Sequence, residues 1–299
     1  MSISVKNLTK RYGDQLAVNN LSFEAQPGEV VGFLGPNGAG KSTTMKIITG
    51  YLPDYEGDVE VCGFNVKSDP IEVKRRVGYL PETNPLYLDM FVREFLIFLA
   101  NITKTPAKRV DEMIEITGLG PEQHKRIGAL SKGYRQRVGL AQAIIHDPEV
   151  LILDEPTTGF DVNQLVDVRS VIKDLGKRKT VLLSTHIMQE VELLCDRVII
   201  IDKGLIRADE PVDALRNSAR QKAIYVRFSG SVSQNALRGI PGVMHARPDG
   251  EAWILESKPK TDLSKVVFDF AVKRQLTIIE NRPITMGLEE VFRNLTKAQ

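Results

Sequence analysis

Residues 35–42 read Gly35-Pro36-Asn37-Gly38-Ala39-Gly40-Lys41-Ser42, and the architecture of the chain is organised around them. This stretch fits the pattern G-x-x-x-x-G-K-[ST], between an apolar run at 30–34 and a helix that we expect to start near Lys41. Glycines let successive backbone N–H groups converge on phosphate oxygens, and the positive end of the following helix adds to that field. The stretch, with the next residue Thr43, therefore predicts a phosphate-binding loop for a nucleotide.

The segments around this loop alternate between apolar runs and helical stretches. Short apolar runs at 30–34, 150–153, 181–184 and 198–201 are typical of buried parallel strands, with helices between them. We expect half-buried antiparallel strands at 3–8 and 21–25, an exposed strand pair at 58–66, and a helical region at about 85–146. The pattern predicts an α/β fold with a mostly parallel sheet core, an antiparallel β part and a helical subdomain.

The pattern changes around residue 220, where a second domain is predicted. We expect a strand at 223–228, a helix at 231–239 and a hairpin of strands 242–247 and 251–256 about Asp249-Gly250. A helix at 261–273, a strand at 276–280 and a last helix at 287–296 follow. The order β-α-β-β-α-β is that of a small ferredoxin-like α+β domain. We therefore divide the chain into domains 1–220 and 221–299.

Length and composition agree with this division and exclude several classes of protein. At roughly 150 residues per domain, 299 residues suggest two domains. A net charge of +2 gives no basic surplus for nucleic acid, and two cysteines, Cys62 and Cys195, point to a reducing compartment. We read no signal peptide and no apolar run long enough to span a bilayer, so we expect any membrane role to work through a partner.

Two adjacent carboxylates, Asp154 and Glu155, follow the predicted strand at 150–153. They would project at the carboxyl edge of the sheet, where open α/β sheets bind ligands. With the phosphate loop, we expect Lys41 to reach the β- and γ-phosphates, Ser42 and Asp154 to hold Mg²⁺, and Glu155 to act as general base on water. The alternative is a helix N-cap with an acid in the first turn, because Pro156 suits a first helical residue.

A third motif carries a resemblance to a known family. It reads Leu130-Ser131-Lys132-Gly133-Tyr134-Arg135-Gln136-Arg137 and resembles the LSGGQ-type signature of ABC ATPases. The phosphate loop, this motif and the acidic pair stand in that family's order, over about residues 1–220. The resemblance implies that two cassettes pack head to tail and that Ser131 and Gly133 of one contact the γ-phosphate held by the other. Alone, Ser131 could be an ordinary N-cap.

The same resemblance assigns three more residues. Tyr12 matches the family's aromatic residue that stacks on adenine. Asp161 lies in the loop that matches the family's contact with the partner cassette. His186 matches the switch histidine, which lies beside the γ-phosphate and would orient Glu155. Each has a structural alternative. Tyr12 could be a half-buried packing residue, as a lone aromatic often is. Asp161 could be an ordinary helix N-cap, and His186 could be a structural side chain after a strand.

The chain departs from the family's pattern at two places. Glu82 stands where the family usually has Gln in the loop that joins the sheet core to the helical region. A carboxylate can still ligate Mg²⁺, but it adds negative charge near phosphate. The signature carries Lys132 and Tyr134 where Gly and Gln are commonest, and Lys132 adds a cation near an anionic site.

A narrower resemblance rests on the run 77–82, on Asn84-Pro85-Leu86-Tyr87, on the signature at 131–134 and on the tail domain. These look like the gliding-motility-associated group of ABC-2-type exporter ATPases. The resemblance implies an ATPase using ATP and Mg²⁺, a homodimer or paired ABC ATPase, and separate transmembrane permease subunits. It implies a place on the cytoplasmic face of the bacterial inner membrane, and no nucleic acid partner.

In the helical region we expect Phe91, Phe95 and Phe98 to share one face, mostly as core. Four residues at the entrance of that helix are better candidates for a partner groove: Pro85, Leu86, Tyr87 and Met90.

Two other classes of function remain as alternatives. A soluble ABC ATPase acting on ribosomes or DNA is disfavoured, because the chain has one phosphate loop and no heptad run. A GTP-binding switch is disfavoured because the guanine-reading NKxD motif is absent from the sequence.

Overall fold

The computed structural model describes residues 1–219, 223–257 and 262–284. The chain divides into two compact units, Met1–Val212 and Asp213–Gln299. We predicted the division after residue 220. In the structure the first unit ends at Val212, the first residue of α8 (Val212–Ala219). The predicted helix at 287–296 lies outside the described residues.

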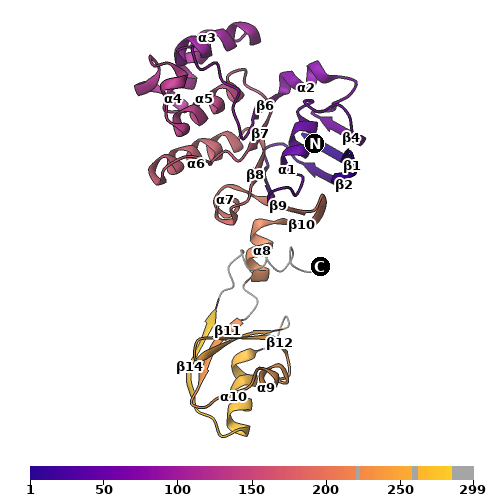
Figure 1. Cartoon of the computed structure of the whole chain (residues 1–299), viewed down its shortest axis with the longest axis vertical. Helices are drawn as coiled ribbons and strands as arrows, with labels where there is room; N and C mark the ends of the chain where they lie inside the picture. The colour runs from indigo at the N-terminus through magenta and orange to yellow at the C-terminus, as the bar shows by residue number, and fades with distance from the viewer. Residues whose placement is uncertain (220–222, 258–261, 285–299) are drawn as a thin grey trace. The chain divides into compact units, whose positions relative to one another are not determined.

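The centre of the first unit is a mostly parallel sheet (Figure 1). Within the described residues its order is β10-β9-β3-β8-β7-β6. All neighbours are parallel except the pair of β9 and β10. The bounds are β3 Val30–Leu34, β6 Val77–Leu80, β7 Val150–Asp154, β8 Thr180–Thr185, β9 Arg197–Asp202 and β10 Leu205–Pro211. Every residue of β3, β7 and β8 is buried, as expected for strands covered on both faces.

An antiparallel sheet packs against one side of this core. Its order is β2-β1-β4-β5, with β1 Ile3–Tyr12, β2 Gln15–Ala25, β4 Glu56–Val61 and β5 Phe64–Asn65. Its apolar side chains share a buried cluster with α1 (Lys41–Ile48) and β3, where the rings of Phe23 and Phe33 lie 5.6 Å apart. α2 (Pro70–Arg76) adds Val73 to the same cluster. This core fixes the strand that leads into the phosphate loop.

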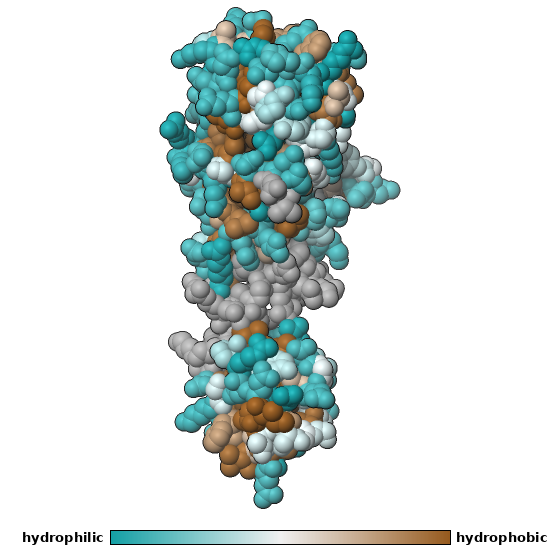
Figure 2. Space-filling model, turned by 90° about the vertical axis from the view of Figure 1, so that its left-hand side faces the viewer, coloured by the Kyte–Doolittle hydropathy of each residue, from teal (hydrophilic) through white to brown (hydrophobic). Residues whose placement is uncertain are grey.

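The helical part lies on the other side of the central strands (Figure 1). It comprises α3 (Val92–Thr103), α4 (Lys108–Ile116), two short 3₁₀ turns (Gly120–Glu122 and Ile127–Ala129) and α5 (Lys132–Ile144). The prediction of one shared aromatic face holds only for Phe95: it is buried, whereas Phe91 and Phe98 are 44 % and 38 % exposed. For Phe91 the reason is that α3 begins at Val92, so Phe91 is its N-cap and lies before the helix. Phe98 lies inside α3 but is not among its buried residues, which include Phe95 and Leu96. The surface in Figure 2 is mostly hydrophilic with scattered apolar patches.

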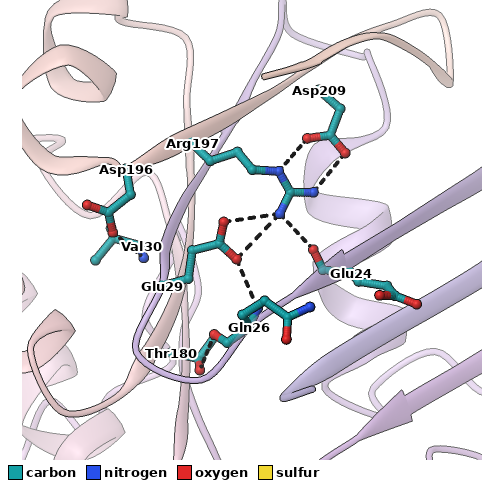
Figure 3. A network of polar contacts seen from close by, with 8 residues as sticks. All are labelled: Glu24, Gln26, Glu29, Val30, Thr180, Asp196, Arg197 and Asp209. Atoms are coloured by element: carbon teal, nitrogen blue, oxygen red, sulfur yellow. Dashed lines mark hydrogen bonds and ion pairs between the residues drawn. The ribbon is translucent and has the colours of Figure 1, made fainter. Parts of the chain in front are cut away.

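Arg197, at the start of β9, connects the central sheet to the antiparallel sheet near the first residues of β3 (Figure 3). Its guanidinium donates to Asp209 on β10, to Glu29 at 3.1 Å and to the carbonyl of Glu24 on β2 at 2.9 Å. The hydrogen bond to Asp209 raises the pKa of Arg197 above its ordinary value. Next to it, Asp196 accepts the backbone N–H of Val30 at 2.9 Å. These contacts hold the start of β3 to β9.

The second unit has the predicted order of elements. It contains β11 (Ala223–Phe228), α9 (Gln234–Arg238), β12 (Val243–Asp249), β13 (Ala252–Ser257), α10 (Leu263–Lys273) and β14 (Ile278–Ile284). The strands form an antiparallel sheet in the order β12-β13-β11-β14, and apolar residues of α9 and α10 share its buried cluster. α9 is shorter than predicted because its N-cap is Ser233, which accepts from Ala236 N. The predicted fold class is confirmed.

Candidate nucleotide-binding site

The phosphate loop joins β3 to α1 and needs glycine for two physical reasons. Gly38 and Gly40 have φ of +80° and +104°, a region that favours glycine. A Cβ on Gly40 would also lie 2.5 Å from the carbonyl oxygen of Ala17. The loop is therefore held in a tight left-handed turn against β2, and α1 begins directly after it at Lys41.

Lys41 turns its ammonium group back over the loop. Its Nζ donates to the carbonyl oxygens of Gly35 at 2.8 Å and Pro36 at 3.1 Å, and the side chain is buried. Burial lowers its pKa, although the charges of Glu155, Asp154 and Glu82 act in the opposite direction. A buried ammonium bound by neutral carbonyls is well placed to bind an anion.

The two carboxylates lie where the sequence predicts, at the carboxyl end of β7. Ser184, at the end of the adjacent strand β8, holds both: its hydroxyl donates to Asp154 Oδ1 and accepts the backbone N–H of Glu155 at 3.0 Å. Glu155 has a φ of +52°, an uncommon conformation for a side chain other than glycine. The helix N-cap alternative is wrong, because the next helix, α6 (Val162–Gly176), begins seven residues after Glu155 with Asp161 as its N-cap.

His186, which follows β8, meets Glu155 across the sheet edge. Its Nδ1 lies 2.9 Å from Glu155 Oε1, a hydrogen bond in which the imidazole N–H donates to the carboxylate. The other carboxylate oxygen, Oε2, is buried and has no hydrogen-bond partner among the described residues. The pair therefore leaves one acceptor oxygen available for a ligand or water.

These residues surround a cavity of about 520 Å³. It brings together ten predicted site residues: Tyr12, Asn37, Gly38, Gly40, Lys41, Ser42, Thr43, Glu82, Glu155 and His186. Tyr12 is 47 % exposed and lines the cavity, so its ring is accessible to a ligand. Three further residues that line the cavity were not predicted: Gln15, Ala17 and Thr158. Only the pairing of Gln15 with Tyr12 across the β1–β2 turn could have indicated Gln15.

Other predicted residues lie beside this cavity. Gly35, Pro36 and Ala39 belong to the loop but do not line the cavity. Asp154, only 2 % exposed, lines a neighbouring cavity of about 610 Å³ together with Ser42 and Glu82. Ser42 and Glu82 line both cavities, so the predicted metal residues surround their junction.

The signature residues form a separate group, at the N-terminal ends of α5 and α6. Ser131 accepts the N–H of Tyr134 at 3.3 Å and Asp161 that of Gln164 at 2.9 Å, so both are N-caps, as their structural alternatives required. The two helix ends touch: a Cβ on Gly133 would clash with Gln164. Ser131, Gly133 and Asp161 are not brought to the cavity of the same chain.

The site fits a nucleotide with Mg²⁺. The buried ammonium of Lys41 donates to two neutral carbonyl oxygens, and Oε2 of Glu155 has no hydrogen-bond partner among the described residues. The hydroxyl of Ser42 and the carboxylates of Asp154 and Glu82 are hard oxygen donors, which Mg²⁺ prefers.

Comparison with known proteins agrees with this geometry. The family profile described as ABC transporter matches residues 18–158, which hold the phosphate loop, the signature and the acidic pair. An uncharacterized ABC transporter ATP-binding protein of Bacillus subtilis, YdbJ, is 34 % identical over 99 % of this chain and 96 % of its own. The Nod factor export ATP-binding protein I of Burkholderia orbicola is 39 % identical over 72 % of this chain and 73 % of its own.

A solved structure shares the fold of the first unit. It is the dimeric post-hydrolysis state of an ATP-binding cassette bound to ADP and Pi, with 25 % identity and a TM-score of 0.65, covering 70 % of this chain and 98 % of that one. Since the described site also carries the loop, acidic pair and histidine expected for nucleotide hydrolysis, we conclude that the chain belongs to the ATP-binding subunits of the ABC transporter family and is an ATPase that uses ATP with Mg²⁺.

Proposed function

We propose that this chain is the ATP-hydrolysing subunit of an ABC-2-type exporter of the gliding-motility-associated group, and that two copies close head to tail on two nucleotides. One observation carries the proposal. The cavity holds the phosphate loop, Glu155 and His186, whereas Ser131 and Gly133 lie apart from it in the same chain. A second copy would bring its own signature residues to the open side of the nucleotide.

Export is supported by a relative and by the sequence. The Nod factor protein is an export ATP-binding protein by name, and it matches 72 % of this chain. The segment 77–87 and the signature resemble those of exporter ATPases. Among the described residues, no helix is long and apolar enough to cross a bilayer. From the resemblance to exporter ATPases we propose that transport is carried by separate membrane subunits, with this chain on the cytoplasmic face of the bacterial inner membrane.

The proposed chemistry follows from the contacts of the cavity. Lys41 and the backbone N–H groups of the loop would hold the phosphates of ATP. The free oxygen of Glu155 would accept a proton from the attacking water, while His186 fixes the carboxylate through its other oxygen. When bound, Mg²⁺ neutralises phosphate charge, and Ser42, Asp154 and Glu82 would hold it. Tyr12 would stack on adenine.

The cavity beside the metal residues is the proposed docking groove for a membrane subunit. Apolar and aromatic residues line much of it, including Tyr51, Pro85 and Leu99. Next to it, Tyr87 is 57 % exposed and meets Phe98 edge-on, with ring centroids 5.9 Å apart. Two predicted groove residues, Leu86 and Met90, are instead partly buried, because their side chains pack against the apolar cluster of α3, α4 and α5.

Affinity capture tests the proposal. The Glu155→Gln protein would be captured with ATP from gently solubilised host membranes, and its partners identified by mass spectrometry. A multi-spanning protein in near-equal amount is expected. Tyr87→Ser added to Glu155→Gln should lose it, whereas Tyr87→Ser alone should keep ATPase activity. Ile71→Ser removes an equally exposed apolar side chain on α2 and serves as the matched control. Recovery with ribosomes or DNA proteins, and no membrane chain, would overturn the exporter assignment.

A further inference from the structure

A separate cavity of about 700 Å³ lies in the helical part of the first unit. Its lining comes from α4, from α6 with the residues that follow it, and from the C-terminal end of α5 (Figure 1). It shares no residue with the nucleotide cavity or with the cavity beside the metal residues. Ser131 and Asp161 cap the opposite ends of α5 and α6, about 20 Å away at 1.5 Å per residue. The cavity is therefore distinct from the site already described.

Apolar side chains form the interior of this cavity. Met113 and Ile116 come from α4, Val171 and Leu175 from α6, and Ile144 from the last position of α5. Residues three or four apart share one helix face, so each helix presents an apolar pair to the cavity. Met113 and Ile144 are each 1 % exposed, whereas Ile116 is 42 % exposed. The apolar lining therefore extends from the packed core to the solvent.

Four cationic side chains also line the cavity, and three of them already bind a carboxylate. The pairs are Arg109–Glu112, Lys177–Asp174 and Lys179–Asp147, each with its two charged atoms 2.6 Å apart. The fourth cation, Arg178, is exposed and makes no side-chain hydrogen bond or ion pair with the described residues. One guanidinium therefore remains beside the apolar interior, and a guanidinium can bind a carboxylate through two parallel hydrogen bonds.

We propose that this cavity binds a free single-chain amphiphilic anion, an alkyl carboxylate in its simplest form. The alkyl chain lies along the apolar faces of α4 and α6, and the carboxylate accepts hydrogen bonds from Arg178. The volume is within the range of cavities that hold small molecules. Met113 and Ile144 lie too deep for the flat surface of a bilayer to reach, which favours a free molecule over a membrane lipid. The site is independent of the proposed export function.

The test is calorimetric titration of the full chain with decanoate, below the concentration at which decanoate forms micelles. We expect saturable binding of one molecule per chain. Arg178→Gln should weaken it about tenfold, because a charge-assisted hydrogen bond is lost. Ile116→Ser should weaken it about fivefold, because less apolar surface is covered. Octanoate should bind about tenfold more tightly than octan-1-ol, which has the same chain length and no charge. Acetate, which has no alkyl chain, should not bind measurably.

Two matched controls change side chains that do not line the cavity. Lys173→Gln removes an exposed cation of α6, and Ile102→Ser removes an exposed apolar side chain of α3. Both should bind decanoate like the parent, and all variants should bind ATP within about twofold of it, which shows that they are folded.

Three results would overturn the proposal. The first is equal affinity for octanoate and octan-1-ol, and the second is unchanged decanoate binding in either Arg178→Gln or Ile116→Ser. The third is pelleting of the parent with phosphatidylglycerol vesicles that is lost in Arg178→Gln, because the anion would then belong to a bilayer. None of these results bears on the pairing of two chains, so they leave the proposed function untouched.

Discussion

The imidazole of His186 and the carboxylate of Glu155 are joined by a 2.9 Å hydrogen bond that links the ends of two neighbouring parallel strands. Glu155 is buried and His186 is 52 % exposed, so the histidine covers the carboxylate from the solvent side. The remaining oxygen of Glu155 has no partner among the described residues. This arrangement fixes the carboxylate through one oxygen and leaves the other available, as the proposed role of Glu155 as general base requires.

Replacing Glu82 by glutamine tests its predicted metal role. Glu82 lines the cavity and acts electrostatically on Lys41, so the change removes a negative charge beside both phosphate and metal. We expect the Mg²⁺ concentration for half-maximal ATPase activity to rise about tenfold. We also expect ATP to bind more tightly without Mg²⁺, because carboxylate–phosphate repulsion is gone. Asp89→Asn, at an exposed carboxylate, is the control. Unchanged Mg²⁺ dependence would remove Glu82 from the metal site.

The phosphate loop should not tolerate a side chain at Gly40. In Gly40→Ala the new Cβ would lie 2.5 Å from the carbonyl of Ala17, so the loop must shift. Nucleotide affinity should fall by at least about a hundredfold, measured with a fluorescent ATP analogue. Gly28→Ala is the matched control: Gly28 also has positive φ, at +75°, but open space around its Cβ position. It should cost about 1 kcal/mol of stability and leave affinity unchanged.

The ion pair of Arg169 and Glu190 should contribute strongly to stability. It joins α6 to α7 (Met188–Leu194), and the Glu190 side chain is only 3 % exposed. Arg169→Ala would leave that carboxylate buried without its partner and should lower the free energy of unfolding by about 3 kcal/mol, read by urea titration. Adding Glu190→Gln should recover part of the loss.

An exposed ion pair provides the comparison for this prediction. Arg75→Ala removes a pair with Glu72 on the surface of α2, and it should cost less than about 1 kcal/mol. Equal losses for Arg169→Ala and Arg75→Ala would contradict the importance of burial at Glu190.

The fold should lose stability below about pH 6.5 through His146. Burial lowers the pKa of His146 in the folded chain, and its Nε2–H donates to the carbonyl of Val77 at 3.2 Å. The unfolded chain, with the ordinary pKa near 6.5, binds the proton more readily, so stability falls as pH drops toward the lower folded pKa. His146→Gln should flatten this part of the curve, measured by urea unfolding between about pH 7.5 and 5.5. The same slope in His146→Gln as in the parent, with exposed His124→Gln as control, would exclude this contribution.

The backbone framework could be predicted because its signals are local. The apolar run at 30–34 forms β3, the runs at 150–153 and 181–184 form β7 and β8, and the loop between β3 and α1 has the predicted context. The alternation of strands and helices in the tail was sufficient to give the order β-α-β-β-α-β. In each case the residues that decide the element are adjacent in sequence.

The parts that could not be predicted depend on tertiary pairing. Ser184 binds both Asp154 and the Glu155 N–H, but no spacing in the sequence indicates that β8 lies beside β7. Gln15 and Ala17 reach the cavity through the register of β1 and β2. The exposure of Phe91 depends on where α3 starts, which helical periodicity alone does not define.

Head-to-tail pairing can be tested by the mass of the Glu155→Gln protein, measured by light scattering with and without saturating Mg²⁺-ATP. The substitution keeps the shape of the side chain but removes the proposed proton acceptor, so we expect hydrolysis to stop and the proposed closed form to persist. We predict a monomer without nucleotide and a dimer with ATP, and a monomer again when Ser131→Arg blocks the signature surface. A monomer at saturating ATP, with ATP binding intact, would contradict the head-to-tail pairing on which the proposed function depends.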